Sequence, residues 1–143
     1  MKFVALTLVA SLSAIFSLNS HAQQVSRCEE PTGVAMWSSE GHKPVPDSFK
    51  GVKPVVIVDD KEMTIVWGNS KSSGGAEKVW KAVIINRNQR SISAVSVDTG
   101  DVGSAVMLYT LDVKRGFLYM LMQKENNFFD TSSAYAFVST CTK

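Results

Sequence analysis

The sequence predicts an all-β domain: an antiparallel meander of about eight strands that closes, fully or partly, into a barrel. Runs of roughly 5 to 9 residues rich in β-branched and aromatic types recur along the chain. Turn-forming residues separate these runs, and no helical period is sustained. A β-sandwich is the alternative architecture, because both arrangements hide the edges of such a sheet.

The first 22 residues are predicted to be a cleaved secretory signal peptide, which leaves 23–143 as a single β-rich domain. Lys2 precedes an apolar stretch over residues 3–18, and the small residues Ser20 and Ala22 stand just before the predicted cut. The stretch is short for a membrane-spanning helix. We therefore expect a periplasmic or secreted protein with no stable membrane anchor after signal cleavage.

The first half of the domain is predicted to contain three strands. "GVAMW" predicts a strand from Val34, and residues 38–54 are predicted to be a long loop because they hold three prolines. "VVIVDD" and "EMTIVWG" predict a pair of strands joined by a turn at Asp59 and Asp60, since Asp favours turns.

The second half is predicted to contain five strands. "KVWKAVII" and "SISAVSVD" are followed by Asp98 and Asp101, which are predicted to be turn residues beside Gly100. "SAVMLYTLDV" and "FLYMLMQK" flank "KRG", which predicts a hairpin with Gly116 in the left-handed conformation. The expected strands begin near residues 34, 55, 62, 79, 90, 104, 117 and 133.

Cys28 and Cys141 are the only cysteines, and they lie near the two ends of the predicted mature chain. In an oxidising compartment paired thiols form disulfides, and two cysteines allow a single pairing. The alternatives are a metal site, a catalytic thiol and a lipidated Cys28. A metal site needs clustered Cys and His ligands, and a catalytic thiol needs a base close by in the fold, for which only His42 is a candidate. Lipidation needs a small residue before the cysteine, where this chain has Arg27. A Cys28–Cys141 disulfide would bring the first and last segments together.

Charge and composition restrict the possible functions. Without Lys2 the domain keeps 14 of the 15 basic residues against 13 acidic ones, so no nucleic-acid partner is expected. Neither a metal nor a cofactor is expected. Because His21 lies in the predicted signal peptide, the domain keeps only His42, which leaves no evident catalytic constellation. We expect a binding protein, with a hydrolytic enzyme as the remaining alternative.

The candidate binding residues are mostly aromatic. Phe128 and Phe129 stand in the polar connection "KENNFFDTSS", where they either fold over one end of a barrel or remain exposed as anchors for a partner. Trp37 precedes the proline-rich segment 38–54, His42 lies within it, and Tyr119 lies on an apolar strand. The expected partner is a protein of the cell envelope or outside the cell. The alternative is a small apolar ligand in a cavity lined by Met107, Met120 and Tyr119.

The expected architecture resembles small exported barrels of Gram-negative bacteria, among them the periplasmic inhibitors of C-type lysozyme. That family carries a Ser-Gly-x-x-Tyr motif and a Tyr-x-x-x-Lys-Gly motif. In this chain Ser73-Gly74 lacks the tyrosine three residues on, and Lys124 is followed by Glu125. The resemblance is therefore architectural. It implies an inhibitor-like or envelope accessory role and assigns no residue a function.

Overall fold

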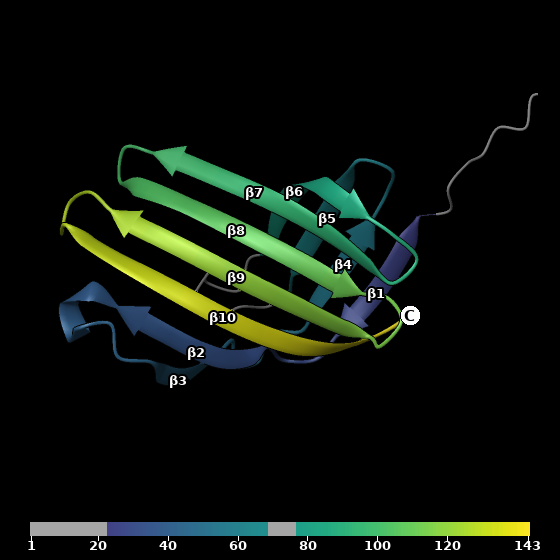
Figure 1. The fold of residues 1–143 in the computed structure, drawn as a ribbon, viewed down its shortest axis with the longest axis horizontal. Coiled ribbons are helices and arrows are strands. Elements are labelled where there is room, and N and C mark those ends of the chain that lie inside the picture. Colours follow the sequence, from purple (N-terminus) through teal and green to yellow (C-terminus); the bar gives the residue numbers. More distant parts are fainter. Residues whose placement is uncertain (1–22, 69–76) are drawn as a thin grey trace, which may run out of the picture.

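A computed structural model describes residues 23–68 and 77–143 and confirms the predicted barrel. Eight antiparallel strands close the barrel and two more extend its wall (Figure 1). The predicted signal peptide and the Ser73-Gly74 pair lie outside the described residues. The strands are β1 (Gln24–Cys28), β2 (Thr32–Trp37), β3 (Val45–Ser48), β4 (Pro54–Val58), β5 (Glu62–Trp67), β6 (Lys78–Arg87), β7 (Ser91–Gly100), β8 (Gly103–Asp112), β9 (Phe117–Asn126) and β10 (Thr131–Thr142), with a short 3-10 helix η1 (Ser38–Glu40) after β2.

Strand β10 closes the barrel because it has different partners along its length. One side pairs with β9. On the other side, residues 133–138 pair with β2, whereas Cys141 and Thr142 pair with Cys28 and Arg27 of β1. Strand β1 continues the closed barrel to β4, whereas β2 and its partner β3 extend the wall beyond β10. The closure is therefore a short ladder, and the Cys28–Cys141 disulfide joins its two strands.

All eight expected strands are present, but the prediction missed β1 and β3. Strand β1 is polar at Ser26, which is buried beside Cys28, so it lacks an apolar alternation. Strand β3 contains Pro46 and, among the described strands, pairs only with β2 at the edge of the sheet, where a missing N–H is tolerated. Residues 38–54 are thus not one long loop, although Phe49 does pack against the core.

One side-chain device shapes four of the hairpin turns. An Asp or Asn at the start of the turn uses its Oδ1 atom to accept the backbone N–H groups two and three residues on, at 2.7 to 3.2 Å. These residues are Asp59, Asn88, Asp112 and Asn126. The N–H groups of Lys61 and Glu62 lower the pKa of Asp59. The turn predicted at Asp59 is confirmed.

Asp98 is not a turn residue, because it pairs with Ala105 inside the β7–β8 ladder. The turn follows three residues later, over Asp101 and Val102. The prediction of a turn at Asp98 is wrong because Gly100, usually a turn residue, is still paired, with Gly103.

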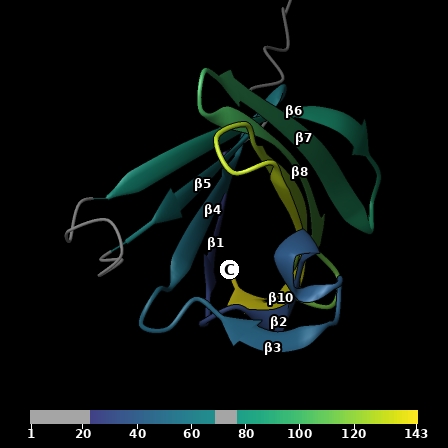
Figure 2. The same cartoon turned by 90° about the vertical axis from the view of Figure 1, so that its left-hand side faces the viewer.

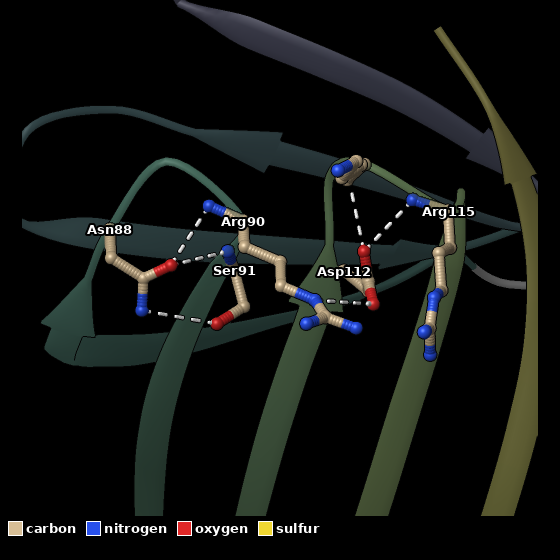
Figure 3. Close-up of polar contacts among 6 residues, drawn as sticks. Asn88, Arg90, Ser91, Asp112 and Arg115 are labelled. Atoms are coloured by element: carbon tan, nitrogen blue, oxygen red, sulfur yellow. Dashed lines mark hydrogen bonds and ion pairs between the residues drawn. The ribbon is translucent and has the colours of Figure 1, made fainter.

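The end of the barrel that holds the disulfide, here called the closed end, is joined by polar contacts between turns (Figure 3). Arg90 Nε lies 3.9 Å from Asp112 Oδ2, and the N–H of Val113 donates to the carbonyl of Arg90 at 2.9 Å. Gly116 has φ 72°, as predicted for this hairpin. A Cβ atom at Gly116 would lie 2.6 Å from the carbonyl oxygen of Cys141, so this position requires glycine.

The core is formed by the inward side chains of the barrel strands and includes Tyr109, which is 1% exposed. The Tyr109 hydroxyl donates to the sulfur of Met107 at 3.2 Å. Burial raises the pKa of Tyr109, because the phenolate would lose its hydration. Burial of the neutral Tyr109 side chain contributes its full stabilisation below the pKa of tyrosine in the unfolded chain, about 10. This contribution falls as the pH rises above that value.

We predict that Tyr109 does not ionise until the domain unfolds at alkaline pH. Ultraviolet absorbance of phenolate, followed together with circular dichroism, should show one tyrosine titrating with the unfolding transition. The Tyr109→Phe variant should lose that coincident component. If the full tyrosine signal develops while the circular dichroism is still native, the inferred burial of Tyr109 is wrong.

The outer face of the sheet carries an apolar belt. One register row crosses six strands without a polar side chain: Val83, Val95, Leu108, Leu121, Ala136 and Val34. Val83 is 66% exposed and Leu121 is 52% exposed. The row is therefore exposed on β6 and β9 and half-buried on β7, β8, β10 and β2.

Candidate functional site

The barrel is open at the end opposite the disulfide, because β6 and β7 separate there (Figure 2). Their ladder runs from Arg87 and Ile92 to Val83 and Val95. Beyond Val83, β6 pairs only with β5, and beyond Val95, β7 pairs only with β8 among the described strands. The wall is thus split into a short half, β4–β6, and a long half, β7–β10 with β2.

The amino acids of the long half explain why the split stays open. Along β7 the inward residues change from buried Ile92 and Ala94 to half-buried Ser96 and exposed Asp98. Along β9 they change from buried Met122 to exposed Lys124. Burying such charged groups without partners is costly, which favours leaving this end of the long half in contact with water.

A continuous chain of aromatic rings runs from one half to the other. Neighbouring ring centroids lie 4.7 to 6.1 Å apart, within the range of favourable aromatic pairs. Its members, in order, are Trp80, Trp67, Phe49, Phe137, Tyr135 and Trp37. Trp67 and Phe137 are buried in the core, whereas Trp80 and Trp37 at the two ends are half-buried. The chain therefore exposes aromatic surface at both sides of the opening.

The inner face of the long half forms a trough between these two tryptophans. Its floor is one register row across five strands: Asp98, Ala105, Lys124, Ser133 and Trp37. Two pockets of about 450 and 330 Å³ share the first three of these residues and together make up the trough. Trp37 and Tyr135 line the larger pocket, and Trp80 and Met107 line the smaller one. Small Ala105 and Ser133 leave the hollow between the larger side chains.

Charge is distributed unevenly along the trough. Asp98 lies on β7, at the split, and Lys124 lies two strands away on β9, a strand-to-strand separation of about 10 Å. The Lys124 ammonium lies 5.4 Å from the centroid of the Tyr135 ring, a cation–π contact. Both charged residues are exposed. The trough thus presents an anionic end, a cationic centre and an aromatic end within one concave surface.

Comparison of this chain with family models, with curated proteins and with solved structures finds no match. The likeness to lysozyme inhibitors therefore remains an expectation from the sequence. Within residues 23–68 and 77–143, no helix has the length and apolar character to cross a membrane. The same residues contain no group of three or more His, Cys, Asp or Glu side chains placed to hold a metal ion.

Four of the five binding residues named from the sequence lie at the open end. Trp37 is on the trough floor, and His42 lines a neighbouring pocket of about 510 Å³. Phe128 and Phe129, in the β9–β10 turn, are 72% and 76% exposed, so they do not fold over the barrel. Tyr119 is 42% exposed on the outer face and contacts Phe117. It therefore shares no face with inward Met107 and Met120.

Sequence reasoning missed Asp98, Lys124, Trp80 and Tyr135 as site residues. A signal for two of them was present in the sequence. Residues of one parity along β9 are apolar up to Met122, and the next residue of that parity is Lys124. Residues of one parity along β7 change in the same way, from apolar Ile92 to charged Asp98. A charged residue that continues an inward-facing series marks the point where the barrel interior meets water.

Proposed function

We propose that this chain is an exported binding domain that takes a polypeptide segment of a protein partner into the trough. The observation that carries the proposal is the floor row, which places a carboxylate, an ammonium group and an indole on alternate strands of one open hollow. Protein segments present charged, polar and apolar side chains together, so this mixture suits a polypeptide better than an apolar molecule.

Carriage of a small apolar ligand is less favoured. Such ligands are held in enclosed, mainly apolar cavities. Met107 and Met120 instead belong to the packed core, where they are 5% and 2% exposed, and Tyr119 faces outward. The three residues expected to line a cavity therefore do not form one together.

The proposed setting is the periplasm or the exterior of the cell. The Cys28–Cys141 disulfide is consistent with an oxidising, extracytoplasmic compartment. Binding through an open trough agrees with the inhibitor-like or envelope accessory role expected from the architecture. In such roles a rigid domain recognises another protein without changing it chemically.

Selection of peptides from a random library on the oxidised domain tests this proposal. Enriched peptides should bind in solution, and the Lys124→Glu variant should bind them at least about tenfold more weakly, since a charge-assisted contact contributes about 1.5 to 3 kcal/mol. Lys114→Glu is the matched control, because Lys114 is an exposed lysine at the closed end. The proposal is wrong if no peptide is enriched, or if both variants bind like the wild type.

A further inference from the structure

We infer that the partner's segment binds as an additional β-strand, hydrogen-bonded to the free edge of β7 at Ser96–Gly100. This inference rests on the proposed function and specifies how the trough is used. It identifies the recognised chemistry as the extended polypeptide backbone itself, with side-chain preferences added by the trough.

The backbone of β7 supplies the first argument. Strand β8 pairs with all ten residues of β7. In an antiparallel sheet alternate residues direct their N–H and C=O groups to opposite sides, so half of the groups in Ser96–Gly100 point away from β8. Continuation of the β6–β7 register would place Lys78–Ala82 against them, but the described ladder ends at Val83 and Val95. The 330 Å³ pocket lies between these two segments.

The residues on three edge segments of the described sheet supply the second argument. Edge strands are commonly protected by proline, by lysine or by shortness. Strand β3 has four residues and contains Pro46, and the free segment of β6 carries Lys78 and Lys81. Ser96–Gly100 of β7 has neither proline nor lysine. Of these edges, β7 is therefore the one left open to an added strand.

The side chains beside this edge predict the sequence of the bound segment. In an added strand, residues opposite Ser96 and Asp98 would face the trough, and the residue opposite Val97 would face outward. Opposite Asp98 we expect lysine or arginine, and opposite Ser96 an apolar side chain that reaches Trp80 and Met107, which line the same pocket. Val97 is 63% exposed, so an apolar residue is expected beside it.

Backbone methylation of a selected peptide tests the inference directly. Methylating one amide nitrogen at a time should weaken binding at least about tenfold at alternate positions of the central segment and leave the positions between them unchanged. Hydrogen exchange of the domain should slow at alternate amides of Ser96–Gly100 when the peptide is bound. If every methylated peptide binds normally and exchange in β7 is unchanged, strand addition is wrong.

These outcomes separate the inference from the proposed function. One outcome is that methylated peptides bind normally, whereas the unmethylated peptides bind the Lys124→Glu variant more weakly than the wild type. This outcome would overturn strand addition and leave the trough as a binding site. A second selection, on Asp98→Lys, should change the enriched residue opposite position 98 from basic to acidic. Asp101→Lys, an exposed acidic residue in the adjacent turn, should leave the selection unchanged. Identical selections on both variants would also contradict the inference.

Discussion

Replacing Cys28 and Cys141 with serine is expected to lower the free energy of unfolding by about 4 to 5 kcal/mol. The two residues are separated by 113 positions, and in the chain-entropy model a cross-link over about 100 residues stabilises a protein by that amount. The effect is large because small domains have only about 5 to 15 kcal/mol of stability in total. The pair is also part of the short ladder that joins β1 to β10.

Chemical denaturation of the wild type and the double variant, at matched protein concentration, measures this difference. Reduced wild-type protein serves as the control, because it loses the cross-link but keeps both buried sulfur atoms, and it should be destabilised by a similar amount. Its thiols should remain protected from alkylation until the chain unfolds, because Cys28 and Cys141 are 3% and 7% exposed. A loss below about 1 kcal/mol would show that the disulfide does not maintain closure.

Gly33→Ala is expected to destabilise the domain by about 3 kcal/mol or more. A Cβ atom at this position would lie 1.9 Å from the carbonyl oxygen of Ala136 and 2.8 Å from Cα of Phe137. Backbone atoms of a central strand cannot yield as a flexible side chain does, so β2 would have to move away from β10. Thermal and denaturant unfolding measure the loss.

Gly100→Ala is the matched control for this prediction. Gly100 also lies in a strand, but a Cβ atom there would meet nothing within 4 Å. Its effect on stability should stay within about 0.5 kcal/mol, as for most surface substitutions. Equal effects of the two substitutions would contradict the close approach of β2 and β10 at Gly33.

The two ends of the barrel differ in a way that suits a binding domain. The closed end combines the disulfide, the Asn88 and Asp112 turns and the Arg90–Asp112 ion pair (Figure 3). These contacts fix the strands from which the trough is built. At the open end the inner face is polar, so it can remain hydrated until a partner binds. Rigid support of this kind limits the ordering cost of binding.

Much of the fold was predictable because single strands carry their own pattern. Alternating apolar residues located eight strands, and the glycine after "KR" located the β8–β9 hairpin. The pairing of Cys28 with Cys141 followed from their number and the expected export. Strands β1 and β3 were not predictable in this way, because a buried serine and an edge proline hide the alternation.

The site was only partly predictable because it depends on register between strands. The sequence indicated Trp37 and His42 because they lie beside and within a segment rich in turn signals. Asp98, Lys124 and Trp37 become one row only through the pairings of β7, β8, β9, β10 and β2. The end of the β6–β7 ladder at Val83 is likewise a property of the assembled sheet. No local pattern in the sequence encodes either feature.

Chemical-shift mapping of the isotope-labelled domain with a selected peptide locates the binding surface. The perturbed amides should cluster at the open end, in Lys78–Ala82, Ser96–Gly100 and around Lys124 and Ser133. Perturbations centred on the outer belt, around Leu108 and Leu121, or on the closed-end turns would contradict binding in the trough.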